Sequence, residues 1–455
     1  AIAFQAHRTA KDGRGVIAET QLYELLEDRF RIAIDADYPE RVKRHVWTEK
    51  VELFLELLVA ESGLIQPDSD GAYVLPHLTF EEYLAACHLA EQQYAGLELA
   101  YTCWSEGGDR WREPLLLMMG CLRRENKHGE VKYWLDLLLD TVAGTIEKTQ
   151  AQQQHDAVLA AACYTELGGR HYLRNYQHAR KVDELEAQLR AALAQVLTQA
   201  DPTSLLPLRI EAATTLGRLG DPRYPVDLEQ WQAELGRLPQ TFGSAPDYFC
   251  HLPGGDHRIG GWDEDEPSAT LALRPFWLAR FPITVAQYAP FAAEGYLSNA
   301  QRWWQPQAWQ WLQREQRHKP LWWNDGGVAN PSRPVVGVTW HEAMAYCAWL
   351  SARLRDALAP GMIIRLPSEA EWETAAAWDG TDGYRDYPWG DHAPSVDRAL
   401  YNAAKLSAPA PVGCCPIGTA ACGALDMAGN VWEMTLSDYH GYPRRSHQVV
   451  RDSSG

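Results

Sequence analysis

Residues 423–433 read Gly-Ala-Leu-Asp-Met-Ala-Gly-Asn-Val-Trp-Glu, and this stretch decides how the chain is interpreted. It combines two glycines with the oxygen-bearing side chains of Asp426, Asn430 and Glu433, and it fits neither helical nor strand periodicity. Such a run predicts a shaped loop whose carbonyls and carboxylates suit a hard cation such as calcium. The alternative is a glycine-rich turn that covers a buried Trp432.

The same stretch resembles the signature of the formylglycine-generating-enzyme (sulfatase-modifying factor) domain, a variant of the C-type-lectin fold. Five further stretches match that domain in the expected order: Phe276-Trp-Leu-Ala-Arg-Phe-Pro-Ile-Thr284, Arg333-Pro-Val-Val-Gly-Val-Thr-Trp340, Ala345-Tyr-Cys-Ala-Trp-Leu350, Arg365-Leu-Pro-Ser-Glu-Ala-Glu-Trp-Glu373 and Pro388-Trp-Gly-Asp391. The resemblance implies an α+β, C-type-lectin-like domain over about residues 245–455, which we expect to continue beyond Gly455.

Composition narrows the possible functions. The 455 residues carry a formal charge of −18, which disfavours binding to a phosphate backbone, so we expect no nucleic-acid partner. No apolar run approaches the roughly 18 residues of a membrane span, so no membrane partner is expected. The nine cysteines include no Cys-x-x-Cys pair, which favours a reduced, cytoplasmic setting. Of these, we expect four to fill the core: Cys87, Cys121, Cys163 and Cys347.

Residues 1–145 predict a helical region. A helix over 51–59 should end near Gly63, and a short strand should follow at 72–75. Thr79 and Glu82 have the spacing of a capping box, so a helix is expected to start there. Its apolar residues Phe80, Tyr83 and Leu84 then predict one buried stripe.

This region resembles the winged-helix segment that follows the ATPase core of NACHT-type (STAND) signalling NTPases, through the pattern His77-Leu-Thr-Phe-Glu-Glu-Tyr-Leu-Ala-Ala86. His77 fits either a sensor or, more simply, a packed or capping histidine. The chain has no Gly-x-x-x-x-Gly-Lys-Ser/Thr phosphate loop. The resemblance therefore implies a nucleotide site upstream of Ala1, in an NTPase or effector domain of the same protein.

Residues 146–240 predict a helical, HEAT-like linker. The stretch 209–223 has small alanines on one face and ends in Gly220-Asp-Pro222, which stops a helix. An ordinary helical bundle is the alternative. We place the boundary with the last domain at 239–246, so the predicted architecture is an all-α, winged-helix and HEAT-like half followed by the α+β domain.

Three capping boxes predict helix starts in the last domain: Thr284 with Gln287, Thr339 with Glu342, and Ser368 with Glu371. A tryptophan-rich insertion either stacks a ligand or builds the core, and the core interpretation is preferred: Trp303, Trp304, Trp309, Trp311, Trp322 and Trp323. Capping and ion pairing explain the charges of 365–373 better than acid–base catalysis.

Catalytic members of the resembled family use a copper-binding pair of cysteines downstream of the signature. This sequence has no cysteine after Cys422, and adjacent Cys414 and Cys415 cannot face each other around Cu(I). Sulfoxide-synthase relatives use histidines for iron, and no histidine pair with ligand spacing occurs. We therefore expect no catalytic residues and no copper in this chain. The alternative is an oxidase whose copper-binding cysteines lie beyond Gly455.

The resemblance also implies a structural calcium site. Asp426, the carbonyls of Gly429 and Val431, and Glu433 match one family site. A second would start at Asn402, although no downstream carboxylate completes it.

The C-terminal residues suggest a recognition surface because Tyr, Arg and Ser suit adaptable contacts. The candidate ligand-binding residues are Tyr439, His440, Tyr442, Arg444, Arg445, His447, Arg451 and Asp452. Proteins diversified by retroelements vary this surface of the same fold. Our first hypothesis is a non-catalytic module of a NACHT/STAND-type signalling or defence protein that binds a protein or other ligand here. A purely structural protein is a further alternative.

Overall fold

The computed structural model of the chain describes residues 1–10, 13–37, 44–68, 71–140, 147–198, 205–244, 248–262, 268–381 and 383–437. The chain forms two compact units, 1–185 and 186–455. The first is helical with one small sheet, and the second combines helices with short strands. The predicted order, an all-α half followed by an α+β domain, is confirmed.

The first unit begins with a three-stranded antiparallel sheet surrounded by helices. The sheet order is β1-β3-β2, and Ile17 pairs with Tyr73 in its register. Ile17, Leu22 and Leu55 are buried in the small core that the sheet shares with the helices. The predicted strand at 72–75 is confirmed. The elements are α1 (Ile2–Thr9), β1 (Val16–Ala18), α2 (Glu19–Asp37), α3 (Arg44–Glu56), the π-helix η1 (Leu57–Glu61), β2 (Gln66–Pro67) and β3 (Ala72–Val74).

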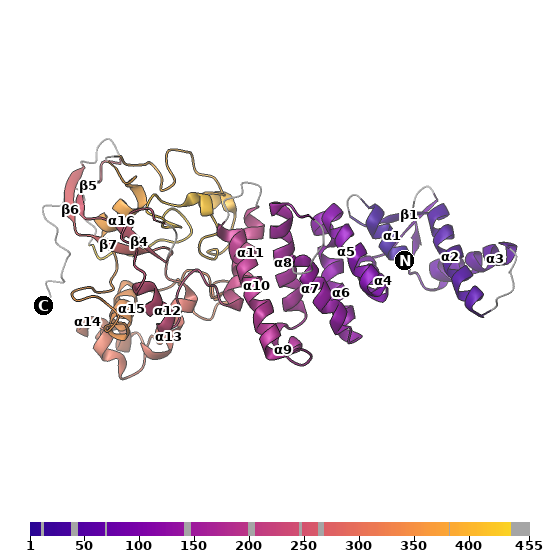
Figure 1. Cartoon of the computed structure of the whole chain (residues 1–455), viewed down its shortest axis with the longest axis horizontal. Helices are drawn as coiled ribbons and strands as arrows, with labels where there is room; N and C mark the ends of the chain where they lie inside the picture. The colour runs from indigo at the N-terminus through magenta and orange to yellow at the C-terminus, as the bar shows by residue number, and fades with distance from the viewer. Residues whose placement is uncertain are drawn as a thin grey trace. The chain divides into compact units, whose positions relative to one another are not determined.

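Consecutive helices follow the sheet and lie side by side (Figure 1). α4 packs on α1 and α6, and α8 packs on α6 and α7. The elements are α4 (Leu78–Glu91), α5 (Gln93–Gly107), the 3-10 helix η2 (Gly108–Trp111), α6 (Arg112–Arg124), α7 (His128–Leu138), α8 (Gln150–Glu166) and α9 (Gly169–Leu173). The division between the two units falls within α10 (Ala179–Thr198).

The start of α4 differs from the predicted capping box. The helix begins at Leu78, with His77 in extended conformation before it, and no side chain caps its first turn. Thr79 is therefore already helical and cannot act as the N-cap. His77 stands at the cap position, but its side chain is exposed and caps nothing, and its ring lies 5.9 Å from that of the exposed Phe80, so neither the packed nor the capping interpretation is confirmed.

The predicted buried stripe of α4 was also wrong. Phe80, Tyr83 and Leu84 are 50%, 37% and 39% exposed. The opposite face is buried because Glu81 points inward, where its carboxylate lies 2.7 Å from Nδ1 of the buried His7 and accepts a 2.8 Å hydrogen bond from the backbone N–H of Gly15. A buried polar network thus sets the rotation of the helix, which apolar periodicity alone does not predict.

After the end of α10, the second unit continues with α11 (Leu206–Leu219), which stops at Gly220, whose φ is positive (90°), as the HEAT-like pattern predicts for a helix stop. Two-stranded antiparallel sheets follow, β4 with β7 and β5 with β6. α16 packs on β5, and both lie on the same side of the unit in Figure 1. The strands are β4 (Phe249–Leu252), β5 (Gly255–Ile259), β6 (Ala269–Leu273) and β7 (Phe276–Ala279).

All three predicted capping boxes of this unit are present, at the starts of α13, α15 and α16. In each, the N-cap hydroxyl accepts from the third helical N–H, and the third side chain accepts from the N-cap N–H. The helical elements are α12 (Leu228–Leu235), α13 (Val285–Glu294), η3 (Ala300–Trp303), α14 (Pro306–Arg314), α15 (Trp340–Arg353), α16 (Glu369–Ala377), η4 (Asn402–Ala404) and η5 (Pro416–Gly418).

Aromatic rings form the core of the second unit. Tyr288, Phe291 and Tyr346 are buried and in mutual ring contact. Trp304 is buried, and four other insertion tryptophans pack against this core: Trp303, Trp309, Trp311 and Trp323. The core interpretation of the insertion is thus correct for five of the six tryptophans, while Trp322 is 51% exposed. Across the residues whose structure is described, no helix has the length and apolarity needed to cross a membrane.

Candidate functional site

The signature loop is held open by left-handed backbone positions. Asp426 and Asn430 have φ of 60° and 62°, and Gly429 has φ of 86°. Gly429 pairs with Leu400 in a parallel bridge, and a Cβ at this glycine would lie 2.4 Å from the carbonyl oxygen of Leu400. Only glycine permits that approach. The bridge brings the segment of Asn402 alongside the loop, so the two predicted metal sites are neighbours.

Asp426 and Asn430 tie the loop to residues 410–413. The buried Asp426 carboxylate accepts a 2.8 Å hydrogen bond from the N–H of Gly413. The Asn430 amide accepts from the N–H of Ala410 at 3.0 Å and donates to its carbonyl at 3.2 Å. Burial raises the pKa of Asp426 to about 6. Asp426 is therefore a carboxylate whose negative charge is poorly compensated by its surroundings.

Glu433 and Trp432 lie at the open side of the loop. Trp372 Nε1 donates a 2.9 Å hydrogen bond to Oε2 of Glu433, a residue that is otherwise exposed. Although the residue as a whole is exposed, packing of its carboxylate beside the protein, and then the charge of Asp426, raise its pKa to about 7 against the opposing effect of the Trp372 hydrogen bond. Trp432 is fully exposed. The alternative interpretation of the loop as a turn over a buried Trp432 is therefore wrong.

These residues fit a calcium ion in part. Two neighbouring carboxylates with raised pKa values favour a nearby cation. One Asp426 oxygen is occupied by Gly413, however, and the Gly429 carbonyl accepts from the N–H of Val431 at 2.8 Å. Within the described ranges, no three His, Cys, Asp or Glu side chains gather in a metal-binding cluster. Glu433 and backbone carbonyls would have to supply the ligands, and calcium stays a prediction.

The cysteines that precede the signature are packed in the interior. Cys414 and Cys415 are buried, and their sulfurs lie 3.9 Å from the carbonyl of Arg209 and 3.5 Å from that of Val396. Burial raises the pKa of Cys415 to about 12, so its thiol is protonated at neutral pH. These two thiols fill space and do not face each other as a metal-binding pair.

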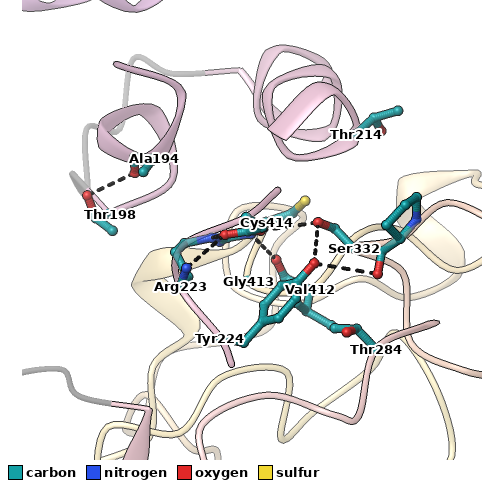
Figure 2. A network of polar contacts seen from close by, with 12 residues as sticks. Ala194, Thr198, Thr214, Arg223, Tyr224, Thr284, Ser332, Val412, Gly413 and Cys414 are labelled. Carbon is teal, nitrogen blue, oxygen red and sulfur yellow. Dashed lines mark hydrogen bonds and ion pairs between the residues drawn. The ribbon is translucent and has the colours of Figure 1, made fainter. Parts of the chain in front are cut away.

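A buried polar network lies next to residues 412–414 (Figure 2). It was not predicted from the sequence. Asp221 follows α11 and binds Arg223 through two hydrogen bonds at 2.7 and 3.2 Å to one carboxylate oxygen. Tyr224 and Ser332 share a 2.8 Å hydroxyl contact, and Arg223 donates to the carbonyl of Val412 at 3.1 Å. The only signal was Asp-Pro-Arg after a helix stop, which is typical of an ordinary turn.

The network fixes α11 to the loop region of the second unit. Arg209 of α11 is buried and donates to the carbonyl of Cys414 at 2.7 Å and to Asp397 at 2.9 Å. Asn330 donates to the carbonyl of Thr214 at 3.0 Å. The signature loop is thus supported from behind by a helix that precedes the family-like stretches in sequence.

Exposed apolar side chains flank the start of α15. Trp340 Nε1 donates to the carbonyl of Thr435 at 3.0 Å, which fixes the segment that follows Trp432. Residues 321–322 lie beside Gly337, where the N–H of Leu321 donates to the Gly337 carbonyl at 3.0 Å. We call the four exposed side chains at these positions the α15 rim: Leu321, Trp322, Trp432 and Met434, which are 64%, 51%, 102% and 40% exposed.

The predicted ligand-binding residues all lie in 438–455, outside the described residues: Tyr439, His440, Tyr442, Arg444, Arg445, His447, Arg451 and Asp452. The α15 rim was not predicted. A signal existed, since Trp432 and Met434 stand on either side of Glu433, and residues two apart share a face wherever the backbone is extended.

Comparison with known proteins places two regions in families. Residues 237–454 match the sulfatase-modifying factor enzyme 1-like domain, and residues 3–89 match the winged helix-turn-helix domain C-terminal to NACHT. A hercynine oxygenase of Mycolicibacterium thermoresistibile is 37% identical over 191 residues, which are 40% of each chain. The chain thus spans about two fifths of the length of that relative.

Two further relatives are covered more completely. The formylglycine-generating enzyme of Thermomonospora curvata is 30% identical over 236 residues, 43% of this chain and 72% of the relative. The inactive Cα-formylglycine-generating enzyme 2 of Mus musculus is 30% identical over 264 residues, 47% of this chain and 76% of the relative. Through its second unit, the chain belongs to the sulfatase-modifying factor enzyme 1-like, or formylglycine-generating-enzyme, family.

Proposed function

We propose that this protein is a non-catalytic recognition module of a NACHT/STAND-type signalling or defence protein. It binds a protein or other ligand through the C-terminal surface of its formylglycine-generating-enzyme-like domain. We include in this proposal that a retroelement varies the residues of that surface. The match of residues 3–89 to a domain that follows NACHT supports an NTPase as the neighbouring part of the same protein. The family contains a relative named as inactive, which supports use of this fold without catalysis.

The observation that carries the proposal is the full exposure of Trp432 on a fixed loop. A large aromatic side chain presented on an ordered backbone loses little conformational entropy on binding, and tryptophan is enriched among the residues that dominate binding energy. Leu436 donates its N–H to the carbonyl of Pro367 at 2.9 Å, so this segment is fixed on a second side. The segment also leads directly into the predicted ligand-binding residues.

The second candidate is an oxidase, which the similarity to formylglycine-generating enzymes and hercynine oxygenases favours. In this candidate the copper-binding cysteines would be supplied from outside residues 1–455. The buried, hydrogen-bonded thiols of Cys414 and Cys415 are unsuited to this role, because a copper ligand must be a reachable thiolate, so this candidate depends entirely on cysteines outside residues 1–455.

Oxygen uptake separates the two. The full natural protein, with any residues that extend it beyond 1–455, is loaded with Cu(I) and offered a cysteine-containing peptide. It is then loaded with Fe(II) and offered hercynine with a thiol. The recognition proposal predicts uptake no faster than metal and substrate alone. Protein-dependent uptake that persists through many turnovers would overturn it.

A further inference from the structure

Two thiols from different helices are in contact in the first unit. Cys87 of α4 and Cys121 of α6 have their sulfurs 3.5 Å apart, and both are free cysteines. The two helices pack closely along this line. An S–S bond is about 2.05 Å long, so a small approach of the two side chains would form one.

The two thiols differ in environment. Cys87 is partly exposed, while Cys121 is 3% exposed. Arg124 donates to the hydroxyl of Tyr83 at 2.8 Å and also hydrogen-bonds the sulfur of Cys87. Burial raises the pKa of Cys121 to about 12, so this second thiol stays protonated.

We propose that Cys87 and Cys121 are a hydroperoxide-sensitive pair that forms a reversible disulfide between α4 and α6. The Cys87 thiolate attacks a peroxide oxygen and becomes a sulfenic acid, and the peroxide leaves as water or an alcohol after taking up a proton. The Cys121 sulfur then attacks the Cys87 sulfur. The sulfenic hydroxyl leaves with the Cys121 proton as water, so two thiols and one hydroperoxide give one disulfide, water and the reduced peroxide. A cellular dithiol or glutathione restores both thiols by exchange.

The position gives this bond a structural consequence. Cys87 lies within the segment that matches the winged-helix family, and Cys121 lies in the helices that follow it. The disulfide would fix the winged helix to these helices. Cys87 also lies three and four residues after Leu84 and Tyr83, on the partly exposed face of α4, so the reactive sulfur is at the same surface as the stripe described above.

The rest of the chain supplies internal controls. Cys103 and Cys163 are buried and have no sulfur partner among the contacts described. Cys250 and Cys422 interact with each other in the second unit, yet both are buried, at 5% and 2% exposure. Because these two thiols are close together but out of reach of a peroxide in solution, we expect this second pair to stay reduced under mild oxidation.

The test is oxidation of the whole chain with hydrogen peroxide, thiol blocking and tryptic mass spectrometry without reduction. Cleavage after Lys50, Arg110, Arg112 and Arg123 puts Cys87 in peptide 51–110 and Cys121 in peptide 113–123. Because peptide 51–110 also contains Cys103, the experiment is run in Cys103→Ser as well. We expect the two peptides to become linked in both proteins and to separate on reduction.

The variants Cys87→Ser, Cys121→Ser and the smaller, apolar Cys121→Ala should each abolish the link. In Cys121→Ala, which leaves no resolving thiol, Cys87 should instead be trapped by a sulfenic-acid reagent. The proposal is overturned by oxidised protein in which 51–110 and 113–123 stay unlinked, by a link that survives Cys87→Ser, or by prior oxidation of Cys250 and Cys422.

Discussion

The hydroxyl of Ser332 donates a 3.1 Å hydrogen bond to Oδ2 of Asp221, and both side chains are buried. This contact joins the turn after α11 to the loop that precedes α15, more than 100 residues later in the chain. The backbone N–H of Val412 donates to the carbonyl of Ser332 at 2.8 Å, so the same serine continues to the segment that supports the signature loop. The helix α11 and the loop-rich domain therefore depend on each other for stability.

Replacement of Asp221 by alanine should destabilise the second unit strongly. The change leaves the buried Arg223 guanidinium without its carboxylate, which typically costs about 3–5 kcal/mol. Chemical denaturation followed by tryptophan fluorescence measures it, since most tryptophans lie in this unit. The matched control is Asp356→Ala, whose ion pair with Arg355 is exposed and should be worth less than about 1 kcal/mol. Equal losses in the two variants would contradict the network's role.

The approach of α11 to Ser332 makes Gly217→Ala destabilising. A Cβ there would lie 2.5 Å from the Ser332 hydroxyl oxygen and 2.9 Å from its Cβ and N, so the helix must move. Overpacking of this kind costs about 1–3 kcal/mol. Gly120→Ala in α6 is the control, because nothing lies within 4 Å of its Cβ position.

The control should leave stability unchanged or raise it by up to about 1 kcal/mol, since alanine favours helix. Thermal unfolding followed by circular dichroism compares the two substitutions. A stabilised Gly217→Ala protein would show that α11 is not held against Ser332.

The pH dependence of stability should change when Asp426 is replaced by asparagine. Burial raises the folded pKa of Asp426 from 3.8 to about 6, so the folded state binds this proton more tightly than the unfolded state. Its favourable contribution is complete below pH 4 and is lost as the pH rises through 6. With calcium removed by chelation, the free energy of unfolding of Asp426→Asn should equal that of the parent near pH 4. At pH 7 it should exceed the parent's by up to about 3 kcal/mol.

Asp379→Asn provides a control of opposite sign. The backbone N–H and hydroxyl of Thr381, with the N–H of Gly383, lower the pKa of the partly exposed Asp379. Stability from this group is present above its unfolded pKa and is lost as the pH falls through the folded one. The Asp379→Asn protein should therefore be less stable than the parent at pH 7, and its stability should approach that of the parent in acid. Parallel pH profiles for the two variants would refute the assignment of Asp426.

Calcium binding should depend on Glu433 and on pH. Because the pKa of Glu433 is raised to about 7, calcium must compete with a proton there, so affinity should rise between pH 6 and 8. Calorimetric titration of the chelator-treated chain should show this rise and its loss in Glu433→Gln. Glu315→Gln, on an exposed residue, should behave as the parent. An absence of binding at pH 8 would rule out the predicted site.

Local sequence signals predicted the second unit better than the first. Its capping boxes depend on residues three positions apart, and Thr284, Thr339 and Ser368 all cap as expected. In α4, by contrast, the long-range pair of Glu81 and His7 decides which face is buried, and no local pattern contains that information. The same holds for Ser332 and Asp221. Trp432 shows a further limit, since a signature residue can be recognised without its exposure being known.

The most direct test of the recognition proposal is a binding titration on Trp432. A peptide selected from a displayed random library against the whole chain is titrated into the parent, Trp432→Ala and Leu297→Ala, where Leu297 is 53% exposed outside the α15 rim. The proposal predicts roughly thirtyfold weaker binding for Trp432→Ala, as for an interface hot spot of about 2 kcal/mol, and unchanged binding for Leu297→Ala. Equal affinities of all three proteins would contradict it.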